Sequence, residues 1–339
     1  MRMHTVYQFA LSATLFTVLC TGGVLPLRAA TAGTYYVATN GHDTNEGTKS
    51  QPFSTIRKGV SVLQPGDTLY IRQGTYAEGI TPASMSIPSG TSWSDAITIS
   101  GYPDETVTLL GDSYAPIALF SDYNIAYLVF ENFTLDASGR SVGFYVGCGS
   151  HHIRLSNSEI KHGVLGVEFC RDADDNEVIN SSVHDSASHG LYIMSSNNLF
   201  DGNQVYNNGG YGYHLYNSGS HTVNNNVVRN SEIYKNGSQL SSAFGIALGC
   251  GSNNVMHDNI VRDNPAGIQV AYGSPPADNT QVYDNTVYGN SPGSGIEIFP
   301  DVTNTLVAHN HVYGNRRGIT DWGGIGTVLS DNTVDGNTW

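Results

Sequence analysis

The chain has 339 residues, of which only 13% are charged, whereas glycine (39 residues) and tyrosine (20 residues) are abundant. Few long charged side chains and many turn-forming residues argue against a helical protein and favour many short strands joined by turns. The formal net charge of −14 argues against a nucleic-acid partner, because nucleic acids are bound through clustered lysine and arginine.

Residues 1–32 have the features of a signal peptide. Arg2 and His4 form a short basic start, an apolar stretch runs from Phe9 to Leu25, and Ala30-Thr31-Ala32 fits a cleavage motif. The apolar stretch is shorter than the roughly 20 residues that a membrane-spanning helix needs, and no later segment meets that need. We therefore expect cleavage near Ala32 and a secreted protein with no membrane partner. Loss of two arginines would lower its net charge to −16.

From about residue 124 onwards one pattern returns every 22 to 29 residues. Each copy has an Asn, an aliphatic residue two positions later, a turn, and a Gly-apolar-x-apolar strand. The Asn position is occupied by Asn132, Asn157, Ser181, Asn203, Asn230, Asn259, Asn285, Asn310 and Asn332, and a second polar column by His162, Ser186, Asn208, Asn236, Asn264, Asn290, Asn315 and Asn337. This period predicts an all-β fold, a parallel β-helix of about nine clear repeats with three strands per coil. We expect the Asn columns to be structural and to form hydrogen bonds from coil to coil.

The segment 34–123 lacks the clean repeat. It opens with the extended run Tyr35-Tyr36-Val37 and continues into a short amphipathic helix from Ile56 to about Leu63. A helix here would cover the open end of the stack, which would otherwise expose apolar side chains and unpaired strand edges. The sequence thus predicts a single β-helix domain over 33–339, with an N-terminal cap and irregular first coils at 33–123 and regular repeats at 124–339.

The start of the expected mature chain resembles that of secreted pectin-lyase-like β-helix proteins. The similar stretch reads GTYYVATNGHDTNEGTKSQPFSTIRKGVSVLQPGDTLYIRQGTY, and the later repeats resemble the parallel β-helix repeats of that superfamily. The resemblance covers 34–339 and implies a right-handed parallel β-helix that is secreted. It does not single out a reaction, because the superfamily includes polysaccharide lyases, glycoside hydrolases, epimerases and non-catalytic surface proteins.

The Gly-apolar-x-apolar strands predict an outward-facing column of side chains, because x points away from the core. Reading x along the stack gives Tyr145, Glu168, Tyr192, His214, Ala247, Gln269, Glu297 and Thr320, and Tyr216 belongs to the next outward column. Rows of aromatic and hydrogen-bonding groups about 4.8 Å apart suit a linear sugar chain. We expect Tyr145, Tyr216, Gln269 and Glu297 to bind a polysaccharide along a groove.

A group of His and Tyr residues is the candidate catalytic centre. A third outward column, before the neighbouring bend, consists of Lys161, His184, Tyr206, Tyr234, Arg262, Tyr288 and Tyr313. The spacing predicts one patch on two adjacent coils, formed by His184, His189, Tyr192, Tyr206, His214 and Tyr216, in which imidazoles can transfer protons near neutral pH. His184, Tyr206 and Arg262 are expected to contact the substrate.

This group favours cleavage of a uronate polymer by β-elimination, as in a polysaccharide lyase. The reaction needs a base for the C5 proton, a group that stabilises the charge on the carboxylate, and an acid for the leaving oxygen. Tyr192 and His214 are expected to be base and acid, with His189 beside them and Lys161 as base or charge neutraliser. The acidic protein would repel an anionic polymer unless Lys161 and Arg262, or bound Ca²⁺, offset its charge.

Three other functions stay open. A glycoside hydrolase needs two carboxyls about 5–9.5 Å apart, whereas Glu168 and Glu297 are five coils, roughly 24 Å, apart. Glu168 would then need a loop partner, for which the candidates are Asp172, Asp174, Asp175 and Asp201. A uronate C5-epimerase shares its first step with a lyase, and a non-catalytic carbohydrate-binding or surface β-helix needs no acid–base pair.

Two smaller features concern metal and disulfide chemistry. Asp172, Asp174 and Asp175 belong to a run of carboxylates that is able to bind Ca²⁺ through oxygen ligands, although such runs are more commonly solvated loops. An Asp cluster of calcium-dependent lyases that resemble this N-terminus is replaced here by the run Gly209 to His214, which argues against that particular site. Cys148 and Cys170 fall on neighbouring coils, which permits a disulfide but fits small buried residues equally well. We assume a monomer.

Overall fold

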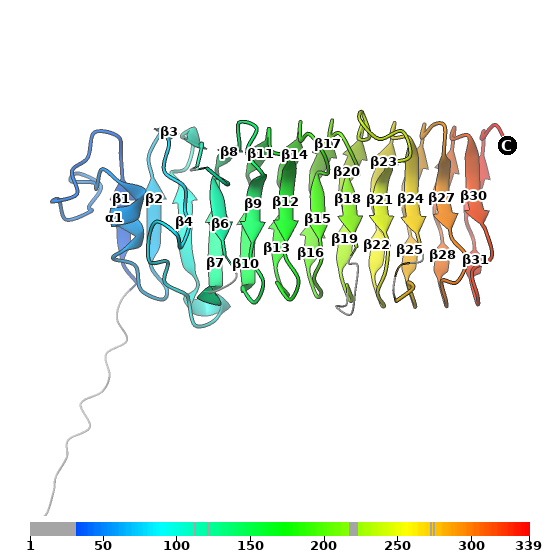
Figure 1. Ribbon diagram of the computed structural model, residues 1–339, viewed down its shortest axis with the longest axis horizontal. Helices are drawn as coiled ribbons and strands as arrows, with labels where there is room; N and C mark the ends of the chain where they lie inside the picture. The colour runs from blue at the N-terminus through cyan, green and yellow to red at the C-terminus, as the bar shows by residue number, and fades with distance from the viewer. Residues whose placement is uncertain (1–31, 112, 121–122, 217–222, 272, 274) are drawn as a thin grey trace, which may run out of the picture. The chain divides into compact units, whose positions relative to one another are not determined.

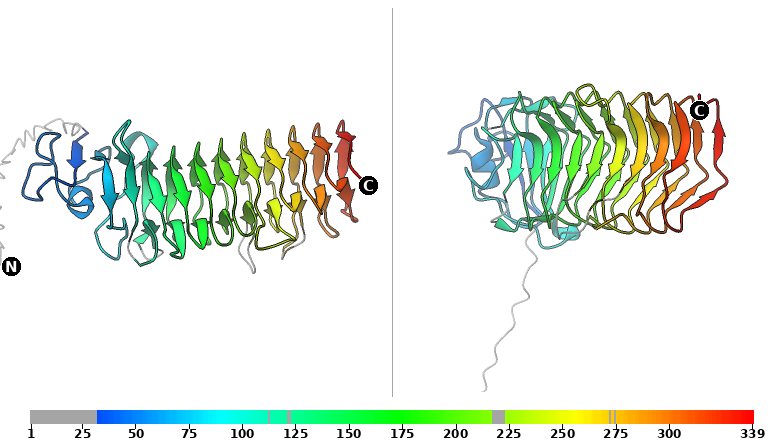
Figure 2. Two further views of the ribbon diagram at one scale, coloured as in Figure 1. Left: turned by 90° about the horizontal axis from the view of Figure 1, so that it is seen from above. Right: turned by 45° about the vertical axis from the view of Figure 1, so that its right-hand side comes forward.

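The computed structural model describes residues 32–339 except 112, 121–122, 217–222, 272 and 274. Nearly all of the predicted signal peptide, residues 1–31, lies outside the described residues. From residue 32 onwards the chain winds through coils of short strands that stack one beside the next (Figure 1). The turned views in Figure 2 show that the coils follow one another in chain order. In the part of the chain that the structure describes, no helix is long and apolar enough to cross a membrane.

Three parallel sheets run along the stack and confirm the predicted parallel β-helix. Sheet A consists of β1 (Thr34–Val37), β2 (Thr68–Ile71), β4 (Ile97–Gly101), β7 (Ala126–Glu131), β10 (His151–Ser156), β13 (Glu177–Ile179), β16 (Leu199–Asp201), β19 (Val227–Arg229), β22 (Val255–His257), β25 (Gln281–Tyr283), β28 (Leu306–Ala308) and β31 (Val328–Ser330). Sheet B consists of β3 (Gly74–Tyr76), β5 (Val107–Leu109), β8 (Thr134–Asp136), β11 (Glu159–Lys161), β14 (Ser182–His184), β17 (Gln204–Tyr206), β20 (Glu232–Tyr234), β23 (Ile260–Arg262), β26 (Thr286–Tyr288), β29 (His311–Tyr313) and β32 (Thr333–Asp335). Sheet C consists of β6 (Ile117–Leu119), β9 (Val142–Val146), β12 (Leu165–Phe169), β15 (Leu191–Ile193), β18 (Tyr213–Leu215), β21 (Phe244–Leu248), β24 (Ala266–Val270), β27 (Ser294–Ile298) and β30 (Arg317–Asp321).

The core lies inside the coils and follows from the alternation of side chains along each strand. In β17, Val205 is fully buried, whereas Gln204 is exposed and Tyr206 is half-buried. Phe169 and Phe200 pack against each other inside the stack, with ring centroids 5.9 Å apart. Each such side chain contributes about 1.5–3 kcal/mol through burial. The same inward positions recur in every regular coil, so one continuous apolar core forms along the stack.

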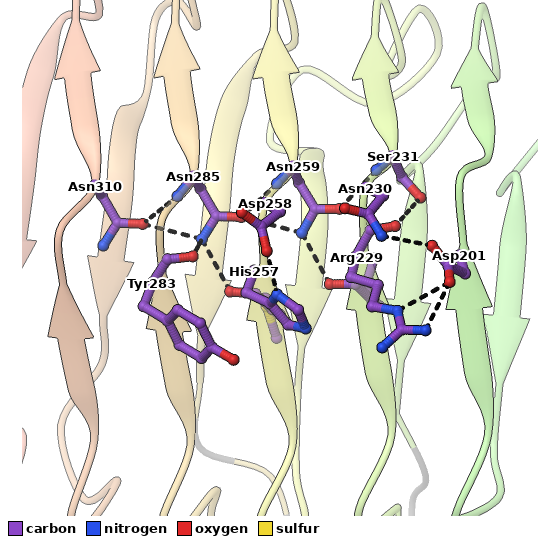
Figure 3. Close-up of polar contacts among 12 residues, drawn as sticks. Asp201, Arg229, Asn230, Ser231, His257, Asp258, Asn259, Tyr283, Asn285 and Asn310 are labelled. Carbon is purple, nitrogen blue, oxygen red and sulfur yellow. Dashed lines mark hydrogen bonds and ion pairs between the residues drawn. The ribbon is translucent and has the colours of Figure 1, made fainter.

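Asn columns join the coils at the bends between strands. In the column between sheets A and B, Oδ1 of Asn285 accepts hydrogen bonds from the backbone N–H and the side-chain amide of Asn259, both at 3.0 Å (Figure 3). Asn310 repeats the arrangement with Asn285. The predicted structural role of the columns is therefore confirmed.

The expected membership of these columns was wrong at some positions. Phe133, Ser158 and Ser231, not Asn132, Asn157 and Asn230, occupy the first column, and His162 lies one residue before the second column. Asn157, Asn230 and His162 instead have positive φ (48°, 52° and 59°), which Asn tolerates better than most residues. A third column, Asn176, Asn198, Asn226 and Asn254, joins sheets C and A and was not expected.

The predicted helix at the N-terminal end of the stack is α1 (Ile56–Val60), which ends three residues before Leu63. The Thr55 hydroxyl accepts a 3.1 Å hydrogen bond from the backbone N–H of Lys58 and caps the helix. Ile56 and Val60 are fully buried, and a Cβ at Gly59 would lie 2.7 Å from Val37 of β1. The helix therefore closes tightly over the first strands. A short 3-10 helix, η1 (Trp93–Asp95), precedes β4.

Candidate active site

The strand register of sheet C confirms the predicted outward column. Successive partners along the stack are Tyr145, Glu168, Tyr192, His214, Ala247, Gln269, Glu297 and Thr320. Glycines at the start of these strands keep the register, because a Cβ at Gly190 would lie 2.7 Å from the carbonyl oxygen of Gly212 on the next coil. Only a residue without a side chain allows the two backbones to approach this closely.

Five rings gather on this face at β15 and β18: His189, Tyr192, Tyr211, His214 and Tyr216, called here the sheet C cluster. The His214 ring is at the centre of the cluster. Its centroid lies 5.1 Å from that of Tyr192, 5.4 Å from Tyr216, 4.6 Å from Tyr211 and 4.9 Å from His189. The prediction that these rings occupy one patch therefore holds for His189, Tyr192, His214 and Tyr216.

Both imidazoles of the cluster are held in the neutral form. Burial lowers the pKa of His189 to about 4, and burial together with the nearby His189 lowers the pKa of His214 to about 3. His189 Nδ1 accepts a 3.1 Å hydrogen bond from the backbone N–H of Tyr211, so the proton of its neutral ring is on Nε2. Nδ1 of His214 is buried without a hydrogen-bond partner among the described residues, so we infer that Nε2 is the ring nitrogen that can face a ligand.

Tyr192 and Glu168, two acidic side chains near the imidazoles, are also shifted towards their own protonated forms. Burial raises the pKa of Tyr192, and the Glu168 carboxylate adds to this effect. Burial also raises the pKa of Glu168, which has no hydrogen-bond or ion-pair partner among the described residues. Neutral imidazoles thus lie beside a phenol that stays protonated at neutral pH, a combination suited to paired proton transfer.

Arg171 supplies a positive charge at this site that the sequence analysis did not identify as functional. It directly follows Cys170, which forms a disulfide with Cys148 of the preceding coil, so its segment is tied to the stack. Its exposed guanidinium lowers the pKa of Tyr192, although burial outweighs that effect. Arg171 has no ion-pair partner in the part of the chain that the structure describes.

Tyr211 is the second residue that sequence reasoning missed. The signal was present in Gly210, because a Cβ there would lie 2.4 Å from His189 Nδ1. Gly249 gives a similar signal on the next coil, since its Cβ would lie 2.4 Å from the Tyr216 ring. Glycines that no positive φ requires can therefore indicate positions where a ring of the cluster packs directly against the backbone.

The expectation that Lys161, His184 and Tyr206 face the same patch was wrong. All three lie on sheet B, where β11, β14 and β17 place them in one column. Lys161 donates a 2.9 Å hydrogen bond to Glu159, and His184 bonds Glu159 at 3.1 Å and stacks on Tyr206 at 4.6 Å. The chain bends between β14 and β15, so outward residues of these strands point to different sides of the coil.

Arg262 and Tyr145 also differ from expectation. Arg262 lies on sheet B, not on the face of the cluster, and is bound by Glu232 at 2.9 Å and Asp263 at 2.7 Å. Its guanidinium lies over the Tyr234 ring, 4.2 Å from the centroid. Tyr145 is on sheet C but is only 9% exposed, because Tyr114 and Phe120 pack over it at 5.5 and 5.8 Å. Tyr145 is therefore covered by other rings, and the Arg262 guanidinium is already paired with two carboxylates.

Gln269 and Glu297 line a hollow of about 370 Å³ on the C-terminal side of the cluster. Tyr211 forms part of its wall and so belongs to both the cluster and the hollow. The prediction that these two outward residues border a groove therefore stands, and the hollow extends the candidate site along sheet C.

The predicted calcium ligands lie in the bend after β12. Asp174 accepts a 2.7 Å hydrogen bond from the backbone N–H of Ser196, and burial raises its pKa. Asp172 and Asp175 have positive φ, both 59°. Among the described residues, no group of three or more His, Cys, Asp or Glu side chains is arranged to hold a metal ion. Calcium binding at these residues stays a prediction.

A three-sheet coil with an Asn column at its bends and a site on the outer face of one sheet defines the class of right-handed parallel β-helix proteins. The model of the family "Right handed beta helix region" matches residues 118–287 and 224–338, and the chain belongs to this family. A second model, "Pel9A-like, right handed beta helix region", matches residues 35–189.

One curated relative is "Uncharacterized protein YwoF" of Bacillus subtilis (strain 168), which is 32% identical over 136 residues. This alignment covers 37% of the present chain and 28% of the relative. The present chain therefore matches less than a third of that protein's length.

Solved structures with the same fold come from several enzymes. An alginate lyase from Paenibacillus sp. str. FPU-7 is 17% identical with a TM-score of 0.65, covering 89% of this chain and 99% of that chain. The lacto-N-biosidase of Eubacterium ramulus is 15% identical with a TM-score of 0.61, covering 89% of this chain and 68% of that chain. The A-module of the Azotobacter vinelandii mannuronan C-5 epimerase AlgE4 is 16% identical with a TM-score of 0.55, covering 80% and 87%. At these identities the similarity establishes the fold.

Proposed function

We propose that this protein is a secreted polysaccharide lyase that cleaves a uronate-containing polymer by β-elimination at the sheet C cluster. One observation carries the proposal: neutral His214 stacks on Tyr192, whose phenol is kept protonated, and their centroids are 5.1 Å apart. The similar folds of an alginate lyase and a mannuronan epimerase add support, because alginate and mannuronan are uronate polymers.

The structure favours specific roles for the two residues. With its proton on the buried Nδ1, His214 has a lone pair on the surface nitrogen Nε2, which takes the C5 proton of the uronate. The C5–H electrons form the C4=C5 double bond, the C4–O bond breaks, and the Tyr192 phenol protonates the leaving oxygen. A proton then passes from His214 back to Tyr192 through solvent. A base with a pKa near 3 is weak, so binding must stabilise the intermediate strongly.

Arg171 takes the role of charge neutraliser that the sequence suggested for Lys161. Its unpaired guanidinium near Tyr192 pairs with the uronate carboxylate and stabilises the charge that develops there. Nε2–H of His189, oriented by the Tyr211 backbone, donates a hydrogen bond to the same carboxylate or to the leaving sugar. Both contacts offset the net negative charge of the protein locally.

The test is a panel of acidic polysaccharides, read for ultraviolet absorbance of the unsaturated product and for reducing ends, with and without a chelator. We expect absorbance from at least one polymer and a loss of at least about 100-fold in Tyr192→Phe and His214→Gln. Tyr283→Phe, on β25 of sheet A, and His42→Ala, at an exposed position before α1, change residues outside sheet C and should keep the activity. Loss of activity on chelation would implicate bound Ca²⁺.

A glycoside hydrolase is the second candidate, because burial raises the pKa of Glu168 as a general acid requires. No neighbouring carboxylate contributes to this shift, and Asp201, one suggested partner, lies on sheet A bound to Arg229 at 2.8 Å. A hydrolase would release new reducing ends without ultraviolet absorbance. Loss of this activity in Glu168→Gln would establish the alternative. Deuterium exchange at C5 without cleavage would indicate an epimerase, and binding without turnover a non-catalytic protein.

A further inference from the structure

The hollow beside the sheet C cluster has the wall of a sugar-binding site. It measures about 370 Å³ and is bordered by Tyr211, Phe244, Pro265, Pro292 and Phe299. Aromatic rings and proline rings cover the apolar C–H face of a pyranose, which is the usual way in which proteins hold sugar rings. The hydroxyls of Ser241 and Ser242 lie at its edge.

One carboxylate, that of Glu297, stands in this wall. Glu297 is only 8% exposed, and it has no hydrogen-bond or ion-pair partner among the described residues. Its neighbours in the strand register are Gln269 and Thr320, which carry no charge. Its carboxylate is not among the fully enclosed polar atoms, so it faces the open hollow, where the hydroxyl groups of a ligand can donate hydrogen bonds to it.

The charges around the hollow indicate whether its ligand is charged or neutral. Among the described residues that line it there is no lysine or arginine; Arg317 lies on the next strand, β30, with its guanidinium over the Trp322 ring, and Arg171 lies on the opposite, N-terminal side of the cluster, after β12. A uronate carboxylate in the hollow would face the Glu297 carboxylate, and the residues that line the hollow offer no cation to pair with it. Sugar hydroxyls, in contrast, can donate to Glu297 in charge-assisted hydrogen bonds.

We infer that the hollow binds an uncharged pyranose residue of the substrate, so that the polymer is a heteropolysaccharide in which the cleaved uronate has neutral sugar neighbours. The inference rests on the proposed function for the uronate and adds the identity of the neighbouring sugar. Gln269 and Glu297 are two and three strands from His214, roughly 10 and 14 Å. The hollow therefore holds a different ring of the chain from the one that is cleaved.

Saturation-transfer NMR on the full folded chain tests this site without any need for turnover. The probes are the methyl pyranosides of glucose, galactose, mannose and xylose, the methyl glycoside of N-acetylglucosamine, and the glycosides of glucuronate and galacturonate. We expect at least one neutral glycoside to bind and Glu297→Gln to weaken that binding at least about tenfold. Phe299→Ala, which removes part of the apolar wall, should weaken it as well. Glu46→Gln removes one charge from an exposed residue at the N-terminal end and should leave binding unchanged.

The result that overturns the inference is stronger binding of the uronates, or neutral binding that does not change in Glu297→Gln and Phe299→Ala, or no binding of any neutral glycoside. Circular dichroism confirms that each variant is folded before it is compared. The lyase activity is measured separately through ultraviolet absorbance. Equal turnover of homopolymeric uronates with no neutral-sugar binding would leave the lyase standing and remove this inference. Neutral-sugar binding that depends on Glu297, without turnover of any polymer, would support this inference and count against the lyase.

Discussion

The backbone N–H of Tyr211 donates a 3.1 Å hydrogen bond to Nδ1 of His189 on the preceding coil. This bond holds the ring in one tautomer and needs Nδ1 to stay unprotonated. Gly210 makes the contact possible by leaving room for the imidazole. A backbone group on one coil thus determines the proton position on a side chain of the preceding coil, within the candidate active site.

The buried imidazoles should make the stability of the protein fall in mild acid. Folding lowers the pKa of His189 from 6.5 to about 4 and that of His214 from 6.5 to about 3. Between pH 6.5 and these values the unfolded chain binds more protons, so the free energy of unfolding decreases as the pH falls. The midpoint temperature of thermal unfolding should therefore fall further between pH 7 and pH 4 in the wild type than in a His189→Gln/His214→Gln variant. Parallel curves for the two proteins would contradict the assigned shifts.

Replacing His214 by phenylalanine should stabilise the protein while it abolishes activity. The change keeps a ring that stacks on Tyr192 and Tyr216 and removes Nδ1, which is buried without a partner. We expect a gain of about 1 kcal/mol in the free energy of unfolding. Denaturant titration followed by circular dichroism measures it, and a loss of stability would show that Nδ1 is satisfied in solution.

Removing the guanidinium of Arg171 should weaken the binding of an acidic polymer. Arg171→Ala is expected to raise KM about tenfold, equivalent to about 1.4 kcal/mol, and to reduce the salt dependence of KM. Arg57→Ala, on the exposed side of α1, is the matched control and should leave KM unchanged. Affinity electrophoresis in gels that contain the polymer would detect the same difference without turnover. Equal KM values in both variants would exclude Arg171 from the site.

Replacing one residue of an Asn column should lower the free energy of unfolding. The side-chain amide of Asn285 donates to the carbonyl oxygens of Met256 and Tyr283, each at 2.9 Å, and its Oδ1 accepts from Asn259. Asn285→Ala leaves several buried backbone groups unpaired, so we expect a destabilisation of about 3 kcal/mol. Asn40→Ala, at an exposed position, should change stability by less than about 0.5 kcal/mol. Similar unfolding midpoints for the two variants would refute the role of the column.

Much of the fold and part of the site could be predicted because they depend on repetition. The column from Tyr145 to Thr320 was read from the glycine that starts each strand, and every partner in it is confirmed by the register. The first Asn column was displaced by one residue at Asn132, Asn157 and Asn230, because at these positions the Asn has positive φ and the adjacent Phe133, Ser158 or Ser231 occupies the column.

Sequence alone therefore determined the coil, its three strands and the order of side chains along each sheet, since alternation and repeat length are local properties of the chain. The tertiary structure decided which columns share a face. The bend between β14 and β15 separates His184 from Tyr192, although they are only eight residues apart. It also decided burial, which shifts the pKa values of His189 and His214 and covers Tyr145 with Tyr114 and Phe120. These properties depend on the direction of each bend and on contacts between coils, which the spacing of residues does not encode.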